Sequence, residues 1–284
     1  MSLITKYEFE APEEGIKLLI LAAVHGNETA GTKACNRLMA ELNSGMVTLK
    51  KGFLTIVPVC NPEAYRKDVR CVEENLNRVM TFHENPQTYE QRLANEICPL
   101  IKRSRVTLDL HSTHCPGDVP FAFCDYPDKY NQTLINALDV EYVLEGWPEI
   151  YGRQQQITDY STEHCAHVYG KTATTLECGY HKAPEAAELA YRAIVGTLAA
   201  FGMTDGELPF SCRKQRIRMD SFVIKEREGK LCRAYKHLDK ISKGERLAVY
   251  DDGEALCAPD DGYILLPNLE ADLGTEWYYL GSAI

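Results

Sequence analysis

The sequence predicts an α/β protein: a mixed, largely parallel sheet flanked by helices, followed by a small all-β C-terminal domain. Up to about residue 205, apolar runs of strand length alternate with segments of helical periodicity, a pattern typical of a sheet covered by helices. Beyond residue 206 the helical periodicity stops, and short β-like runs are separated by Gly-containing turns. We therefore expect two domains, residues 1–206 and residues 207–284.

Each expected element rests on its own pattern. The strands of the first domain are the apolar runs Ile16 to Val24, Gly52 to Val59, Val106 to Leu110, Val119 to Cys124 and Lys171 to Glu177. Helices are expected where apolar residues recur every three or four positions, at Ala30 to Leu42, Tyr89 to Lys102, Asn131 to Leu138 and Ala183 to Phe201. The strands of the second domain are expected at Ile217 to Lys225, Leu231 to Tyr235, Leu247 to Tyr250 and Tyr263 to Leu266.

Composition and charge narrow the class of protein. The 284 residues, 45% hydrophobic and 25% charged, are enough to bury a full core. A net charge of −10 argues against nucleic acid as a partner. Neither a membrane-length apolar run nor a signal-peptide pattern is found. The 11 cysteines lie singly and are expected to be reduced thiols. The composition therefore predicts a cytoplasmic protein without a membrane partner.

Metal-binding side chains follow the ends of three expected strands. His25 and Glu28 come directly after the first strand, His111 ends the third, and Glu177 ends the fifth. Because ligands of open α/β sheets bind beyond the carboxyl ends of the strands, these side chains are expected to converge. An imidazole and a carboxylate three residues apart bind zinc when a third ligand arrives from elsewhere, which leaves a fourth position open. Alone, the first motif is a weak signal and is more typical of a surface turn that opens a helix.

Taken together with Asn61-Pro62-Glu63-Ala64, Arg70 and Asn75-Leu76-Asn77-Arg78, these segments resemble the succinylglutamate desuccinylase/aspartoacylase family, a branch of the zinc carboxypeptidase superfamily. The resemblance implies one zinc ion per chain, with metal ligands and site residues as follows: His25, Glu28 and His111 as ligands, Glu177 as the base that activates the zinc-bound water, Arg70 as the group that polarises the scissile carbonyl, Asn77 and Arg78 as the carboxylate grip, and Tyr278 as a substrate-contacting tyrosine from the C-terminal domain.

The chemistry of these residue types agrees with that assignment. Amide hydrolysis needs an activated water, a base that returns its proton to the leaving nitrogen, and a fixed cation at the developing oxyanion. Glu177 suits the second task and Arg70 the third. The planar guanidinium of Arg78 can hold a carboxylate by two parallel hydrogen bonds. The bland interpretation is that Arg70 and Arg78 belong to a solvated basic stretch with Arg66 and Lys67.

Two departures bear on the substrate. His111 is followed by Ser112 and Thr113, where acetylaspartate-cleaving members carry Asn then Thr. Residues 161–170 also lack the arginine that binds a second substrate carboxylate in those members, and Arg153 is the nearest candidate. Both departures disfavour an aspartate-type leaving group.

The sequence thus predicts a zinc-dependent hydrolase of carbon–nitrogen bonds in linear amides, a deacylase whose partner is a small N-acyl amino acid. A zinc carboxypeptidase on short peptides and a zinc-dependent binding protein without turnover are the alternatives. A homo-oligomer stays open.

Overall fold

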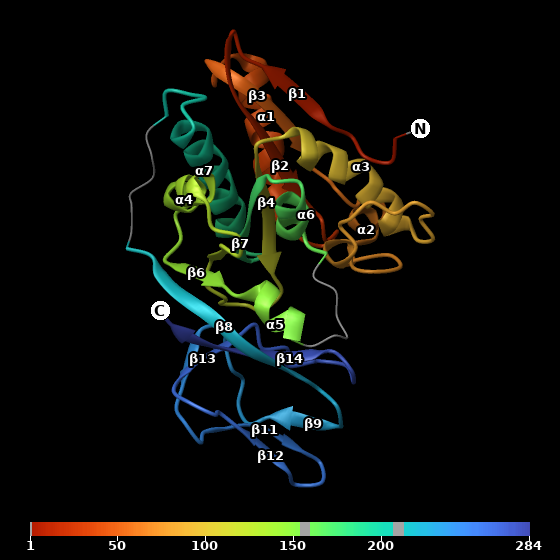
Figure 1. Ribbon diagram of the computed structural model, residues 1–284, viewed down its shortest axis with the longest axis vertical. Coiled ribbons are helices and arrows are strands. Elements are labelled where there is room, and N and C mark those ends of the chain that lie inside the picture. Colours follow the sequence, from red (N-terminus) through yellow and green to blue (C-terminus); the bar gives the residue numbers. More distant parts are fainter. Residues whose placement is uncertain (1, 154–159, 207–212) are drawn as a thin grey trace.

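The computed structural model describes residues 2–153, 160–206 and 213–284. It is built around one 11-stranded mixed sheet, ordered β1-β3-β2-β4-β7-β5-β6-β8-β14-β13-β10, and a separate sheet of three strands, β12-β11-β9 (Figure 1). Helices cover the N-terminal half of the large sheet, whereas the C-terminal half is covered mainly by other strands (Figure 1). The predicted fold class is confirmed.

The parallel centre of the sheet positions the site. Its strands are β3 (Lys51–Val57), β2 (Glu13–Ala22), β4 (Val106–Thr113) and β7 (Thr172–Tyr180), which run parallel to one another. Edge strand β1 (Tyr7–Glu10) pairs antiparallel with β3. The register places Ala22 beside Leu110, and His111 beside Glu177. Residues that follow these strands therefore meet at one edge of the sheet, as the sequence predicted.

Two apolar layers lie on opposite faces of the central strands. Alternation along β2 sends Leu18 and Ile20 to one face and Leu19 and Leu21 to the other. The first face packs against α1 (Ala30–Ser44), α4 (Lys129–Ala137) and α7 (Pro184–Ala200). The second packs against α3 (Tyr89–Arg103) and α6 (Thr162–Val168). The shorter helices are α2 (Pro62–Lys67), the 3-10 helix η1 (Leu76–Arg78) and α5 (Trp147–Arg153). Of the helices in the described part, none combines the length and apolar character needed to cross a membrane.

The C-terminal strands continue the large sheet. Beyond β7 come β5 (Phe121–Phe123), β6 (Tyr142–Glu145), β8 (Gln215–Ile224), β14 (Glu276–Ala283), β13 (Gly262–Leu265) and β10 (Asp239–Ile241). The separate sheet contains β9 (Gly229–Leu231), β11 (Arg246–Tyr250) and β12 (Ala255–Cys257). Because β8 pairs with β6, one ladder of hydrogen bonds runs across the expected domain boundary.

The element boundaries show where the sequence pattern failed. Strands β1, β6, β10, β12 and β14, like the short helices α2, α5 and α6, were not predicted. The expected strand from Leu231 to Tyr235 is wrong: β9 ends at Leu231, and Tyr235 is a buried core residue. The residues after 206 do form strands, but their division from the rest as a domain stays a prediction. Its boundary adjoins residues 207–212, which lie outside the described residues.

A buried histidine joins the two halves of the molecule. His237 is 4% exposed, its ring centroid lies 4.3 Å from that of Phe121 on β5, and its Nδ1 accepts a hydrogen bond from the backbone N–H of Leu266. Burial lowers the pKa of this imidazole to about 3. The folded protein therefore keeps His237 neutral at a pH where the unfolded chain protonates it.

This difference predicts a pH-dependent stability term. Because the pKa of His237 is depressed on folding, its contribution is intact above the unfolded value of about 6.5 and is lost as pH falls towards 3. We expect the free energy of unfolding of the wild type, measured by urea denaturation, to fall between pH 6.5 and pH 5.0. In His237→Gln this fall should be about 2 kcal/mol smaller. Equal losses in the two proteins would show that His237 is not buried as a neutral group.

Candidate metal centre and active site

A cavity of about 540 Å³ opens where the central strands end. Its lining includes all but one of the predicted site residues: His25, Glu28, Arg70, Asn77, Arg78, His111 and Glu177. These residues come from segments far apart in the sequence, and the parallel register of β2, β4 and β7 brings them together. A single concave site thus contains groups able to bind a metal, transfer a proton and hold an anion.

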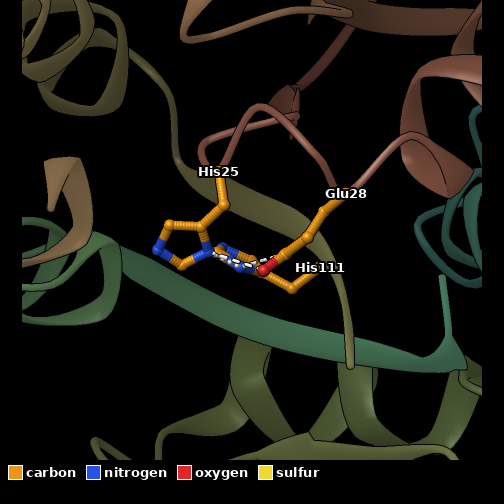
Figure 2. A group of neighbouring side chains, drawn as sticks. All are labelled: His25, Glu28 and His111. Atoms are coloured by element: carbon orange, nitrogen blue, oxygen red, sulfur yellow. Dashed lines mark hydrogen bonds and ion pairs between the residues drawn. The ribbon is translucent and has the colours of Figure 1, made fainter. Parts of the chain in front are cut away.

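The predicted metal ligands face one another (Figure 2). The Nδ1 atoms of His25 and His111 lie 3.2 Å apart, and the carboxylate oxygens of Glu28 lie 2.8 Å from the first and 3.0 Å from the second. All three ligand atoms fall within 4.8 Å of one another, and the three residues are buried. Two imidazole nitrogens and one carboxylate form a donor set suited to zinc.

The Nε2 atoms of His25 and His111, which point away from Glu28, each face a hydrogen-bond acceptor. The Asn75 Oδ1 atom accepts a hydrogen bond from the backbone N–H of Asn77 and lies 2.9 Å from His25 Nε2. The Asp109 carboxylate lies 3.0 Å from His111 Nε2. Both contacts favour a proton on Nε2, so in the neutral form of each ring, which metal binding requires, the Nδ1 lone pair is directed at the same small space as Glu28. Electron pairs that converge in this way repel unless a cation lies between them, so the residues fit a metal ion.

The surroundings also tune the ligands. Burial, assisted by Arg70, lowers the pKa of His25 to about 4 and keeps this imidazole neutral. Burial opposes ionisation of Glu28, yet attraction to His25 and His111 holds the pKa of its carboxyl well below the usual range. Glu28 also accepts hydrogen bonds from the Arg70 guanidinium, at 3.0 Å, and from the backbone N–H of Ser112, at 3.1 Å. A neutral imidazole and an ionised carboxylate are the ligand forms that zinc requires.

The loop that follows β2 needs a glycine. Ala23, with φ of 48°, turns the chain sharply after the strand. A Cβ added to Gly26 would lie 2.1 Å from the carbonyl carbon of Ala64 in α2, a distance that no side chain can occupy. With no side chain there, the backbone N–H of Gly26 donates to the carbonyl oxygen of Arg70 at 3.1 Å. Gly26 thus lets the segment that carries Arg70 pack against the loop of His25 and Glu28.

Glu177 has the environment expected of a general base. It lines the cavity beside His111 in the sheet register, and its Oε2 atom is buried with no hydrogen-bond partner among the residues that the structure describes. Burial and the nearby Glu28 carboxylate raise the pKa of Glu177 to about 8. A carboxyl group whose pKa lies near neutral pH can both accept and return a proton. Strand alternation places its neighbour Cys178 in an apolar layer on the other face of the strand.

Arg70 and Asn77 each use part of their hydrogen-bonding capacity within the protein. Arg70 contacts the predicted metal ligand Glu28 through its Nη1 atom and lines the cavity. Asn77 uses its Oδ1 atom to accept hydrogen bonds from the backbone N–H and the hydroxyl of Thr162 in α6. This leaves the amide NH₂ of Asn77 as its donor for a carboxylate. The roles predicted for both residues stay predictions.

Arg78 rests on an aromatic platform. Its Cζ lies 5.1 Å from the ring centroid of Trp147 and 5.5 Å from that of Tyr151, both in α5. Its Nη1 also donates to the carbonyl oxygen of Asn77 at 3.0 Å. Cation–π contacts and this hydrogen bond fix the orientation of the guanidinium at the cavity wall. Arg78 is therefore placed where a carboxylate grip could act, although its binding role stays a prediction.

The tyrosine assignment needs correction. Tyr278 is 1% exposed and belongs to the apolar cluster beneath the small sheet, and it is not among the residues that line the cavity. Tyr279 lines the cavity instead. A register irregularity between Glu276 and Tyr278 and the alternation along β14 send these neighbouring tyrosines to opposite faces. Arg153, the candidate for a second carboxylate, has a side chain outside the described residues.

Several site residues were not identified from the sequence. The spacing of Asp109 and His111 places both on one face of a strand, so the Asp-Leu-His motif did contain a signal for Asp109. Asn75 also lies within a noted motif, but nothing in the sequence indicated its contact with His25. Trp147, Tyr151 and Glu276 come from segments whose meeting depends on the order of β6, β8 and β14 in the sheet. No local pattern shows that order.

Comparisons with known proteins point to one family. The succinylglutamate desuccinylase/aspartoacylase catalytic domain matches residues 14–199. A succinylglutamate desuccinylase of Shewanella denitrificans is 40% identical in an alignment of 294 positions, gaps included, which covers 95% of this chain and 81% of that protein. A succinylglutamate desuccinylase of Pseudomonas fluorescens is 35% identical over 128 residues, which cover 42% of this chain and 37% of the relative. The chain thus aligns with little more than a third of the length of that second relative.

Solved structures show the same fold at low sequence identity. A succinylglutamate desuccinylase/aspartoacylase from Rhodobacter sphaeroides has a TM-score of 0.78 at 17% identity, covering 99% of this chain and 90% of that one. The product-bound ectoine utilization protein EutE (DoeB) of Ruegeria pomeroyi has a TM-score of 0.76 at 21% identity, covering 98% of this chain and 88% of that one. From the match over residues 14–199 and the near full-length similarity to the Shewanella protein, the chain belongs to the succinylglutamate desuccinylase/aspartoacylase family.

Proposed function

We propose that this protein is a zinc-dependent amide hydrolase that removes the acyl group from an N-acyl amino acid, or from a closely related small amide that carries a carboxylate. The observation that carries the proposal is the meeting of His25, Glu28 and His111 with the buried carboxylate of Glu177 in one cavity. A cavity of about 540 Å³ is of a size typical for small molecules. Membership of a deacylase family supports the same class of reaction.

His25, Glu28 and His111 would hold the zinc ion. When bound, zinc acts as a Lewis acid and lowers the pKa of a water molecule to about 7. Asp109 and Asn75 keep the two imidazole rings in the orientation and tautomer that metal binding needs. Arg70 and the backbone N–H of Ser112 hold the Glu28 carboxylate in place.

Glu177 carries the proton transfers in this proposal. Its free Oε2 atom takes a proton from the attacking water and later delivers it to the nitrogen of the leaving amine. An amine leaves poorly as an anion, so the second transfer matters as much as the first, and such general acid and base catalysis typically contributes about 10²–10⁴ in rate. The raised pKa of Glu177 suits a group that must perform both transfers near neutral pH.

Arg70, Asn77 and Arg78 would orient the substrate and stabilise charge. A fixed guanidinium near the metal ligands favours the tetrahedral oxyanion over the flat amide, which is the role proposed for Arg70. Arg78, held on Trp147 and Tyr151, and the free amide of Asn77 would bind the substrate carboxylate.

A turnover screen tests the proposal. Full-length protein loaded with zinc would be supplied with N-acyl amino acids, among them N-succinylglutamate and N-acetylaspartate, and with dipeptides and tetrapeptides, while released amine is measured. Small N-acyl amino acids should exceed tetrapeptides in kcat/KM by at least about tenfold, a discrimination of about 1.4 kcal/mol. Preferred cleavage of peptides would identify a carboxypeptidase. Stoichiometric zinc without turnover of any compound would identify a binding protein.

Replacing Arg78 by alanine should mainly weaken substrate binding. Loss of a charge-assisted hydrogen-bonding pair costs about 1.5–3 kcal/mol, so we expect KM to rise about 10- to 100-fold with a much smaller change in kcat. Steady-state kinetics on the best substrate of the screen would measure both constants. Arg66→Ala, which removes an exposed arginine paired with Glu63, is the matched control and should leave KM unchanged. An unchanged KM in Arg78→Ala would remove the carboxylate grip from the proposal.

A further inference from the structure

A chain of hydrogen bonds runs between α5 and β14 at the wall of the cavity. The Tyr151 hydroxyl donates to Glu276 Oε1 at 2.9 Å, and it lies 2.6 Å from the Tyr279 hydroxyl. Tyr151 and Tyr279 are 2% and 5% exposed, whereas Glu276 is partly exposed; Glu276 and Tyr279 line the cavity. None of the residues in this hydrogen-bond chain has been assigned to metal binding or to proton transfer.

The direction of the protons in this chain follows from donor counting. A tyrosine hydroxyl has one proton to donate, and a carboxylate can only accept. Because Tyr151 gives its proton to Glu276, the short contact between the two hydroxyl groups requires Tyr279 to donate to Tyr151. Burial raises the pKa of both tyrosines above the ordinary value, so both keep their protons at neutral pH. The oxygen of Tyr279 then has only lone pairs left to offer.

The aromatic packing holds this order in place. Tyr151 stacks between Trp147, at a centroid distance of 4.9 Å, and Phe222 of β8, at 5.0 Å. Trp147 also stacks on Tyr279 at 5.3 Å. With both rings packed on two sides, the hydroxyl groups cannot swing to new partners without disturbing the apolar cluster that joins α5, β8 and β14.

We propose that Tyr279 and Glu276 together form an acceptor-only wall that selects a substrate whose group at this wall is a hydrogen-bond donor. The inference rests on the proposed function, because it concerns which N-acyl amino acid that cavity takes. A side chain ending in an amide, a hydroxyl or an ammonium group donates to Tyr279 and Glu276. A side chain ending in a second carboxylate meets a lone pair of Tyr279 and the negative charge of Glu276 there, and neither of these two groups can donate a hydrogen bond to it.

Arg78 determines which end of the substrate faces the acceptor wall. Its guanidinium rests on Trp147 and Tyr151, the residues that also hold Tyr279, so the cation and the acceptor wall belong to one structural unit. One carboxylate of the ligand binds at Arg78 while a donor group faces Tyr279 and Glu276. The substrate class assigned by the structure is thus an N-acyl amino acid with one carboxylate and a donor-bearing side chain.

Binding of a near-isosteric pair tests this selection without turnover. N-acetylglutamine and N-acetylglutamate differ only in the terminal amide or carboxylate of the side chain. Isothermal titration calorimetry on the zinc-loaded, full-length Glu177→Gln protein at pH 7.5 should give a Kd at least about tenfold lower for N-acetylglutamine. Nα-acetylornithine, a third ligand, distinguishes an ammonium group from a neutral donor as the preferred form.

Two variants test whether Tyr279 and Glu276 cause the preference for N-acetylglutamine. Glu276→Gln adds a donor amide, and Tyr151→Phe keeps the ring but removes the acceptor of the Tyr279 proton, so Tyr279 can donate again. Each should reduce the ratio of the two Kd values at least about fivefold. Glu270→Gln removes an exposed carboxylate six residues before Glu276 and should leave the ratio unchanged. Because the ratio is measured within one protein, differences in the active fraction cancel.

The outcomes separate this inference from the proposed function. Equal or tighter binding of N-acetylglutamate, no binding of either compound, or a ratio unchanged in both Glu276→Gln and Tyr151→Phe would overturn the acceptor wall. A clear preference for N-acetylglutamine in a protein that hydrolyses no member of the screen would support the wall and refute the hydrolase.

Discussion

Glutamine in place of Glu177 is expected to lower kcat by at least about 100-fold while the protein keeps its zinc. Glutamine has nearly the same size and fills the same half-buried position, but it cannot accept the proton of the attacking water. The expected loss is large because the Oε2 atom of Glu177 has no hydrogen-bond partner among the described side chains, so no neighbour is placed to take over the transfer. Stopped assays of amine release and elemental analysis of zinc would measure the two quantities.

A matched glutamate controls for general effects of the substitution. Glu185 lies in the first turn of α7, is exposed and does not line the cavity. Glu185→Gln should change stability by no more than a few tenths of a kcal/mol, through the helix dipole, and should leave kcat unchanged. If Glu177→Gln retained more than about a tenth of wild-type kcat, Glu177 would not be the base.

Alanine in place of either histidine of the metal centre should remove most of the zinc, but the two variants should differ in stability. His25 has an uncharged outer partner, Asn75, whereas His111 is paired with the carboxylate of Asp109, which is 0% exposed. His111→Ala therefore leaves a buried carboxylate without its partner, a loss that typically costs about 3–5 kcal/mol. With both variants stripped of metal by a chelator, urea denaturation should show His111→Ala to be the less stable by about 2 kcal/mol or more.

A double variant isolates the cause of that difference. Adding Asp109→Asn to His111→Ala removes the stranded charge and should recover part of the lost stability without restoring zinc. His167→Ala, an exposed histidine stacked on Tyr126, should keep both zinc and stability. Undiminished zinc content in His25→Ala and in His111→Ala would refute the metal centre. Equal stability of the two would refute the pairing with Asp109.

The parts of the site that the sequence predicted are those that follow directly from strand ends. His25 and Glu28 follow the end of β2, and His111 and Glu177 lie in the last residues of β4 and β7, so parallel neighbours place all four at one edge. The central strands and long helices were predictable for a related reason. Each buries one face or both against a large layer, so its hydrophobic period is strong.

The rest depended on information that no local pattern contains. Tyr278 and Tyr279 are adjacent residues of the same type, and the local irregularity in the pairing of β14 with β8 is part of what decides which of them faces the cavity. Strand β6 has only 4 residues, too few for a clear period, yet its pairing with β8 joins the C-terminal strands to the rest of the large sheet. Without that junction the sequence could not show that Glu276 would reach Tyr151.

The continuous sheet has a consequence for how such a protein can change its substrate. Four register pairs between β6 and β8, from Tyr142 beside Gln215 to Glu145 beside Arg218, link the C-terminal strands to the part of the sheet that positions the predicted metal ligands. The cavity wall on β14 is therefore not a module that can be exchanged as a block, because a transplanted segment would have to match the ladder of β8 as well as the aromatic rings of α5. New specificity in this scaffold is expected to arise by single replacements at positions such as Glu276, which alter the chemistry of the wall and leave the ladder intact.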